Sequence, residues 1–308
     1  MMQFKSLGWH GIVLNIPWEW EVTSESGGKR EAYFRMDDAT QSRMEVKWEH
    51  MEAKTTPLTL ILDNMIEKMK KDRRQLRKAK VLTRGSSKIC DHTGSFIMWQ
   101  NGAKALATSW YCDETKRLYL IQFFYKPEGQ QAEEELIEGI LKSAVCHSDD
   151  EMVPWTVLDV QFELPKDLLL ESRKLLVGRA HMFFASKEMS LLVDWHGFAE
   201  GLLEKHGSLR KWFEGRPAQD VTKNLKIKLP SVQEEDGAAL NYKTSQKGSL
   251  IGGPTMVLGR VWLDTEMNKL FSAFMKSSEK AVDPEGDFKR IIGSFKKVSP
   301  LSYKVDQS

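Results

Sequence analysis

The chain has 308 residues, 41% of them hydrophobic, and its 45 basic and 43 acidic side chains give a formal net charge of +2. This length suits two domains that each bury a core, and the low net charge excludes a global attraction to nucleic acid or an anionic membrane. No apolar run reaches the roughly 18 residues that span a bilayer, and the N-terminus lacks a signal-peptide pattern, so we expect a cytoplasmic protein without a membrane segment.

Similar markers recur in the same order along the two halves, which indicates an internal duplication with a period of about 150 residues. Ile16-Pro17 corresponds to Leu164-Pro165, and both halves reach a Pro-Glu-Gly step, at 127–129 and 284–286, that opens an amphipathic helix. The remaining correspondences are Trp48 with Trp195, Trp110 with Trp262, Leu106 with Leu258, Leu118 with Leu270, and Ile137, Gly139 and Leu141 with Ile291, Gly293 and Phe295. We therefore predict two repeats, residues 1–150 and 151–308.

Each repeat is predicted to contain strands, one helix, more strands and a closing helix. In the first half, alternating apolar residues indicate strands over 32–36, 44–48, 95–99, 106–112 and 118–125. Apolar residues at helical spacing follow Pro57, and a second such stripe covers 132–144. Short turns between strands imply an antiparallel sheet, and each amphipathic helix needs that sheet to cover its apolar face. The predicted fold class is α+β, with each repeat an antiparallel sheet flanked by helices.

This order of elements, with Pro17 after a short apolar strand and the ending Trp20-Glu21-Val22, resembles the fold shared by the photosystem II protein PsbP and the Ran-binding import factor Mog. The resemblance covers both halves and implies a PsbP/Mog-like sandwich in each. It also implies non-catalytic binding, because most relatives in that superfamily are binding proteins. No motif aligns residue by residue, so no functional residue is transferred.

The search for catalytic motifs favours a protein that is not an enzyme. The sequence contains no Gly-x-Ser-x-Gly elbow, Walker loop or dinucleotide-binding glycine fingerprint. Gly27-Gly28-Lys29-Arg30 lies between two strands and does not lead into a helix, so we expect a plain turn. We expect no cofactor.

Cysteine and histidine occur together in Cys90-Asp91-His92 and in Cys146-His147. A tetrahedral metal site needs four ligands at suitable spacings, and the two fragments lack a partner pair. We therefore expect no metal site, with Cys90, Cys112 and Cys146 free and independent of metal. All three cysteines lie in the first half, so a disulfide framework is not part of the duplicated fold.

Tryptophans at equivalent strand positions, such as Trp48 and Trp195, are expected to form the core of a duplicated sheet. Trp9, Trp18, Trp20 and Trp212 are less constrained by the repeat. Trp18 and Trp20 share one face of a segment that we expect to be extended. We predict that these two side chains contribute to a partner-binding surface.

One basic segment breaks the symmetry between the halves. Between positions 68 and 84, Asp72 is the single acidic residue, and the basic residues are Lys68, Lys70, Lys71, Arg73, Arg74, Arg77, Lys78, Lys80 and Arg84. Cations at the end of a helix are favourable with its dipole, so a solvated helix end is one interpretation. The other is a contact for RNA, another polyanion or an acidic protein surface.

Three functional hypotheses follow. The first is a non-catalytic binding or adaptor protein with a protein partner, favoured by the duplication and the lack of a catalytic motif. The second is an RNA- or ribosome-associated factor that uses residues 68–84. The third is a small-ligand carrier or enzyme with a pocket between the two halves.

Overall fold

The structure is a computed structural model that describes residues 2–52, 56–72, 79–126, 130–246 and 254–301. The chain forms two compact units. The first contains the residues up to Val160 together with those from Val298, and the second contains Gln161–Lys297. No helix among the described residues is long and apolar enough to cross a membrane.

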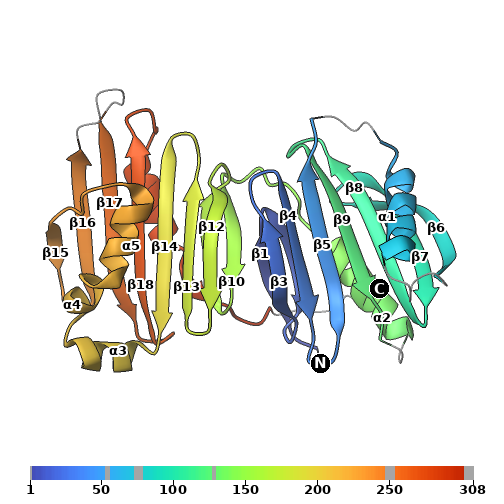
Figure 1. Cartoon of the computed structure of the whole chain (residues 1–308), viewed down its shortest axis with the longest axis horizontal. Helices are drawn as coiled ribbons and strands as arrows, with labels where there is room; N and C mark the ends of the chain where they lie inside the picture. Colours follow the sequence, from blue (N-terminus) through green and yellow to red (C-terminus); the bar gives the residue numbers. More distant parts are fainter. Residues whose placement is uncertain (1, 53–55, 73–78, 127–129, 247–253, 302–308) are drawn as a thin grey trace. The chain divides into compact units, whose positions relative to one another are not determined.

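A seven-stranded antiparallel sheet forms the centre of the first unit (Figure 1). Its strands follow the order β3-β4-β5-β9-β8-β7-β6. The bounds are β3 (Glu21–Gly27), β4 (Glu31–Asp37), β5 (Ser42–His50), β6 (Lys80–Ile89), β7 (His92–Asn101), β8 (Ala103–Cys112) and β9 (Arg117–Phe124). Gly27 ends β3, and Gly28, Lys29 and Arg30 form the turn to β4, so the Gly-Gly-Lys-Arg segment makes a turn as predicted.

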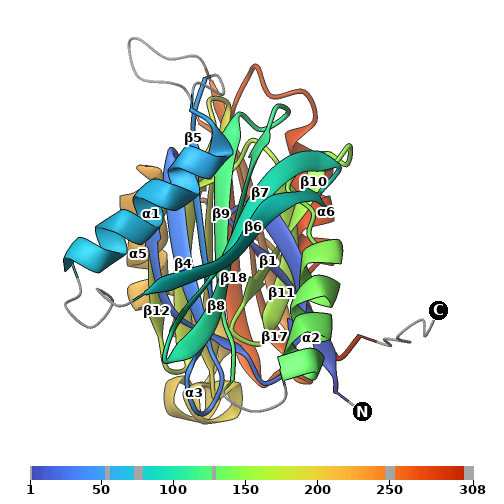
Figure 2. The ribbon, with the colours of Figure 1, turned by 90° about the vertical axis from the view of Figure 1, so that its right-hand side faces the viewer.

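Two helices lie on opposite faces of this sheet (Figure 2), α1 (Leu58–Asp72) and α2 (Gln130–Lys142). Leu58, Leu62 and Ile66 are buried on one side of α1, as their helical spacing predicts, and the helix packs on β7 and β8. Ile137 and Ile140 of α2 are buried, and so is Ala144, which follows the helix. Each helix therefore covers one face of the sheet, as the apolar periodicity indicates.

The first unit also contains the hairpin of β1 (Phe4–Trp9) and β2 (Ile12–Pro17), together with β10 (Met152–Val157). Gly8 N donates a hydrogen bond of 3.0 Å to Thr156 Oγ1. A Cβ on Gly8 would lie 2.2 Å from the carbonyl oxygen of Pro154, so only glycine allows β1 and β10 to approach this closely.

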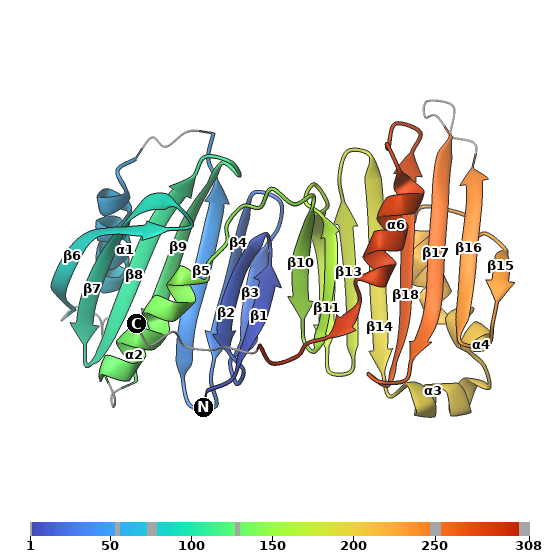
Figure 3. The same ribbon diagram turned by 180° about the vertical axis from the view of Figure 1, so that it is seen from behind.

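The second unit has a seven-stranded antiparallel sheet of its own, in the order β12-β13-β14-β18-β17-β16-β15. The bounds are β12 (Leu169–Leu176), β13 (Arg179–Ala185), β14 (Met189–Gly197), β15 (Val232–Glu235), β16 (Ala239–Gln246), β17 (Thr255–Asp264) and β18 (Lys269–Ser278). Two short strands outside this sheet, β11 (Val160–Pro165) and β19 (Lys296–Lys297), precede and follow these strands in the chain. Helices α3 (Ala199–His206), α4 (Leu209–Phe213) and α5 (Arg216–Leu225) lie between β14 and β15 in the chain. Of these, α4 and α5 pack on the sheet, and α6 (Pro284–Gly293) lies across its other face (Figure 3).

The two sheets have the same strand order, and their central strand pairs β5–β9 and β14–β18, and β8–β9 and β17–β18, have the same register, which confirms the predicted duplicated α+β fold. Trp48 pairs with Tyr119, and Trp195 pairs with Phe271. Trp110 stacks on Tyr119 with ring centroids 4.9 Å apart and planes 9° apart. Trp262 stacks on Phe271 at the same distance and angle. We retain 1–150 and 151–308 as the proposed extents of the repeats, because β10 and β11 begin the second repeat as β1 and β2 begin the first.

The predicted alignment of the closing helices is wrong by three residues. Ser143 Oγ donates to the carbonyl of Ile140 and accepts from Asn15 N, and Ser294 Oγ makes the same two bonds with Ile291 and Glu163. Ile140 is therefore the equivalent of Ile291, where Ile137 was expected. An apolar stripe repeats every three to four residues, so the pattern matches almost as well after a slip of one turn.

Candidate functional site

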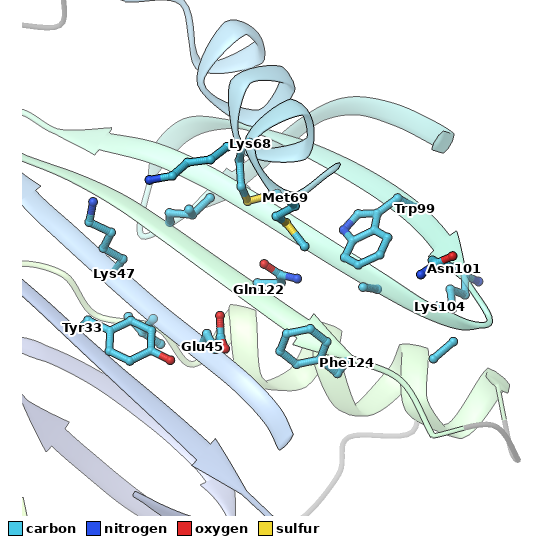
Figure 4. A pocket seen from close by; sticks show the side chains of 15 residues that line it. Tyr33, Glu45, Lys47, Lys68, Met69, Trp99, Asn101, Lys104, Gln122 and Phe124 are labelled. Atoms are coloured by element: carbon cyan, nitrogen blue, oxygen red, sulfur yellow. The ribbon is translucent and has the colours of Figure 1, made fainter. Parts of the chain in front are cut away.

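A cavity of about 570 Å³ lies on the α1 face of the first unit's sheet, and we call it the α1 cavity (Figure 4). It is bounded by β4, β5, β7, β8, β9 and α1. Its lining residues are Tyr33, Glu45, Val46, Lys47, Met65, Lys68, Met69, Trp99, Asn101, Ala103, Lys104, Ala105, Leu120, Gln122 and Phe124. The volume falls within the range of about 300–1,000 Å³ that is typical of small-molecule sites.

The alternation of the strands brings these side chains to one face. On β9, Leu120, Gln122 and Phe124 line the cavity, while Tyr119 and the other intervening residues are buried on the α2 face. Glu45 lies directly opposite Gln122, and Ala105 lies opposite Phe124. Residues from separate strands thus meet across the cavity floor.

The apolar part of the lining comes from both the sheet and the helix. Trp99 is buried, with 4% of its surface exposed, while Phe124 and Leu120 are half-buried. Met65 and Met69 of α1 line the cavity, and Met69 extends from the helix over it (Figure 4). Methionine and aromatic side chains adapt well to apolar ligands.

Gln122 is the central polar group of the α1 cavity (Figure 4). Its side chain is 6% exposed, and its amide nitrogen Nε2 is buried without a hydrogen-bond partner among the described residues. A buried donor in this state costs about 1–3 kcal/mol of stability. The lining of the α1 cavity therefore includes a buried hydrogen-bond donor without a partner among the residues that the structure describes.

Tyr33 and Glu45 form a second polar group on the floor. Burial raises the pKa of the Tyr33 hydroxyl, and the charge of Glu45 and a hydrogen bond to that carboxylate raise the pKa further. The phenol is therefore neutral at physiological pH and donates to the carboxylate. This pairing holds Glu45 in place beside Gln122.

Cationic side chains lie along the rim. Lys47 and Lys68 are exposed and lie toward the same end of the α1 cavity (Figure 4). Lys47 is 3.6 Å from Glu49 in an exposed pair, which contributes little. Lys104, toward the other end, is bound to Glu134 at 2.7 Å. The Lys47 and Lys68 end can therefore attract an anionic group.

The equivalent position in the second unit is filled. Leu192 and Phe274 replace Glu45 and Gln122 in the matching register, and both are buried. Phe213 of α4 stacks on Phe274 with centroids 5.3 Å apart and planes 3° apart. Gly259 lies beneath that ring, since a Cβ there would be 2.2 Å from a Phe274 ring carbon. The α1 cavity is therefore a property of the first unit's sequence and is not required by the fold.

A polar network in the second unit has a structural explanation. Asp194 is 2% exposed on its side chain and is paired with His181 at 2.8 Å, His196 at 2.9 Å and Arg179 at 2.8 Å. Burial alone would raise the pKa of Asp194, but the hydrogen bonds from His181 and Arg179 and the nearby His196 ring hold it well below its usual range. Asp220 also binds Arg179. The carboxylate is compensated within the network, which is typical of a buried structural ion pair.

The basic segment does not form one continuous surface of unpaired cations. Lys68 lines the α1 cavity, and Lys71 and Lys80 are exposed. Lys70 is bound to Glu67 at 2.9 Å, and Arg84 to Asp63 at 3.1 Å. The remaining members, Arg73, Arg74, Arg77 and Lys78, lie outside the described residues. Polyanion binding by this segment stays a prediction.

The prediction that Trp20 belongs to a partner surface is wrong, because this side chain is 2% exposed beneath the Arg43 guanidinium, 5.1 Å from the ring centroid. Trp20 N donates to the carbonyl of Pro17, so the chain turns here and the two tryptophans do not follow an extended strand. Trp18 is half-buried, with the Lys5 ammonium 5.6 Å from its ring. Trp18 alone remains a candidate for that surface.

The expectation that the two Cys-His fragments lack partners is also wrong. The structure brings His92, Cys112, Cys146 and His147 together, with one potential ligand atom of each within 4.8 Å of the others. Cys112, which is the last residue of β8, joins the two fragments. Sequence spacing did not show this, because strand pairing carries Cys112 to the fragments across a long stretch of chain.

Sequence reasoning also missed the α1 cavity, although one signal was present. Gln122 interrupts an otherwise apolar strand at the position where the second repeat has Phe274. A residue-by-residue comparison of the two repeats would have marked this change from a core aromatic to a polar side chain.

Comparisons with known proteins found similar solved structures but no family. No protein-family model matches the chain, and no curated protein matches it. The solution structure of cyanobacterial PsbP (CyanoP) from Synechocystis sp. PCC 6803 is 12% identical over 48% of this chain and 94% of its own, with a TM-score of 0.34. A crystal structure from Bacteroides thetaiotaomicron VPI-5482 is 13% identical over 51% of this chain and 56% of its own, with a TM-score of 0.28.

Proposed function

We propose that this chain is a non-catalytic binding protein whose first unit binds a small amphipathic molecule in the α1 cavity. The observation that carries the proposal is the buried amide nitrogen of Gln122, which has no hydrogen-bond partner among the described residues, in a cavity that the second unit fills with Phe274.

Energetics support a ligand at this position. An empty cavity lowers the stability of the first unit because its lining lacks packing contacts. The buried Gln122 amide nitrogen without a hydrogen-bond partner lowers that stability by about 1–3 kcal/mol more. The second unit avoids both with Leu192, Phe274 and Phe213. A ligand that packs on the cavity floor and accepts a hydrogen bond from Gln122 offsets both costs in the first unit.

The lining indicates the chemistry of the ligand. Trp99, Phe124 and the two methionines suit an apolar or aromatic body. Lys47 and Lys68 suit an anionic group at one end. None of the described lining residues is His, Cys, Ser or Thr, and the carboxylate of Glu45 is held by Tyr33. This composition favours binding over nucleophilic or general-base catalysis.

The proposal can be tested with the anionic fluorophore 1-anilinonaphthalene-8-sulfonate as a probe. A variant that copies the second unit, with Glu45→Leu, Ala107→Gly and Gln122→Phe, fills the cavity; the glycine provides the space that Gly259 gives Phe274. The matched control is Gln100→Phe, the same exchange at an exposed position of β7.

We expect the parent protein and the control to bind one probe molecule per chain, and the filled variant to lose at least tenfold in affinity. Equal affinity of the filled variant and the parent would refute the α1 cavity as the binding site. This site lies within the first unit, whereas the sequence led us to consider a pocket between the halves. A protein partner and a cytoplasmic location remain proposals.

A further inference from the structure

Four side chains with metal-binding atoms converge in the first unit, apart from the α1 cavity. His92 begins β7, Cys112 ends β8, and Cys146 and His147 follow α2, where the chain bends at Cys146. Their ligand atoms all lie within 4.8 Å of one another. Two histidine nitrogens and two cysteine sulfurs form one of the ligand sets that bind Zn²⁺ in structural sites.

The distances between these atoms fit a common tetrahedral centre. His92 Nε2 lies 3.3 Å from His147 Nδ1, and Cys112 Sγ and Cys146 Sγ each lie 3.5 Å from that same nitrogen. With Zn–S of about 2.3 Å and Zn–N of about 2.0 Å, tetrahedral geometry places two nitrogens about 3.3 Å apart, and a nitrogen and a sulfur about 3.5 Å apart. The three distances to His147 Nδ1 therefore match those between ligands of one ion, and the remaining pairs lie within 4.8 Å.

Hydrogen bonding alone accounts poorly for this arrangement. Three groups approach the Nδ1 atom of His147, which has a single lone pair and accepts one hydrogen bond when it is unprotonated. At most one of the three contacts can be a hydrogen bond accepted there. A metal ion resolves the conflict, because every ligand then directs its lone pair at the ion.

The duplicated fold does not require this cluster. In the second unit, Asp264 stands at the position of Cys112 and accepts a hydrogen bond of 2.9 Å from Met267 N in the following turn. Cys112 and Cys146 are fully buried, while the two histidines are half-buried and give access from solvent. The thiols are thus sheltered, and an ion can reach the set from the histidine side.

We propose that His92, Cys112, Cys146 and His147 bind one Zn²⁺ in a closed tetrahedral site. Since all four positions are taken by protein atoms, the ion has a structural role and leaves no place for a substrate. It ties the start of β7, the end of β8 and the segment after α2 together, so part of its binding free energy stabilises the first unit. This reverses the metal independence expected from the sequence.

Elemental analysis of the full chain, purified without chelators and under reducing conditions, tests the site. We expect one zinc per chain, and at least a tenfold lower content in Cys112→Ser and Cys146→Ser. Cys90→Ser is the matched control, because Cys90 lies nearby but donates its thiol to the carbonyl of Ala144 at 3.2 Å. Retention of zinc by both test variants would contradict the proposal, as would zinc-free parent protein that cannot be loaded.

Cobalt provides a readout that does not depend on the folding of the variants. Stripped parent protein titrated with Co²⁺ should show thiolate-to-cobalt charge transfer and the strong visible bands of a tetrahedral ion, saturating at one equivalent. Weak octahedral bands would overturn the proposal. Another result would also overturn it. Mass spectrometry without reductant would find a Cys112–Cys146 disulfide in the isolated protein, and the protein would still take up no metal after reduction.

Discussion

Replacing Gln122 by Met should make the first unit more stable and impair its ligand binding. The exchange keeps the length of the side chain and removes a buried amide whose Nε2 has no partner among the described residues. Relief of an unsatisfied buried donor is worth about 1–3 kcal/mol. We therefore expect the free energy of unfolding of the first unit to rise by about 1–2 kcal/mol, while affinity for the fluorescent probe falls about tenfold.

Two compact units rarely unfold as one, so the change has to be measured on the first unit alone. Hydrogen exchange of peptides from β8 and β9 gives that local stability, and peptides from β17 and β18 provide the internal reference. Gln100→Met, at an exposed position of β7, should change stability by less than about 0.5 kcal/mol. The reasoning is refuted if Gln122→Met destabilises the first unit, or if it stabilises the unit and leaves probe affinity unchanged.

Three further predictions concern the rest of the molecule. Asp194→Asn should lower the free energy of unfolding of the second unit in urea by about 3–5 kcal/mol, and Asp220→Asn, at a more exposed position, should lower it clearly less. Because the pKa of Asp194 is lowered in the folded state, the stabilisation by its carboxylate should be complete above about pH 4 and be lost at more acidic pH. A smaller loss than that of Asp220→Asn would contradict the network. Trp110→Leu should destabilise the first unit by about 2–4 kcal/mol, since the fully buried ring stacks on Tyr119; an unchanged melting temperature would contradict this. Replacing the five central basic residues by glutamine should lower the salt concentration at which the protein elutes from heparin, while the circular dichroism spectrum stays the same. If elution is unchanged, the basic segment is a solvated helix end and does not bind polyanions. Those positions are Lys70, Lys71, Arg73, Arg74 and Arg77.

The fold could be predicted from the sequence because the same pattern of strands and helices occurs in both halves of the chain. Trp48 and Trp195, and Trp110 and Trp262, mark equivalent strands, and core packing of a duplicated sheet preserves such large side chains. The alignment failed where the signal is periodic: one helical stripe matches another after a slip of one turn, and only the hydrogen bonds of Ser143 and Ser294 fix the register.

The candidate sites depend on contacts that spacing does not reveal. Cys112 reaches the two Cys-His fragments through strand pairing, and Gln122 becomes unusual only when its equivalent, Phe274, is known. Trp20 was misjudged because a turn after Pro17 moves it from the expected extended face into the core. In each case tertiary structure, and not local pattern, decides what a side chain touches.

The most direct test of the central claim is a crystal structure of the protein with the bound fluorophore. The α1 cavity should contain electron density for the probe, with its rings against Trp99 and Phe124 and its sulfonate toward Lys47 and Lys68. Density for the probe on the second unit or on an outer surface, with the α1 cavity free of it, would contradict the claim that the first unit holds the binding site.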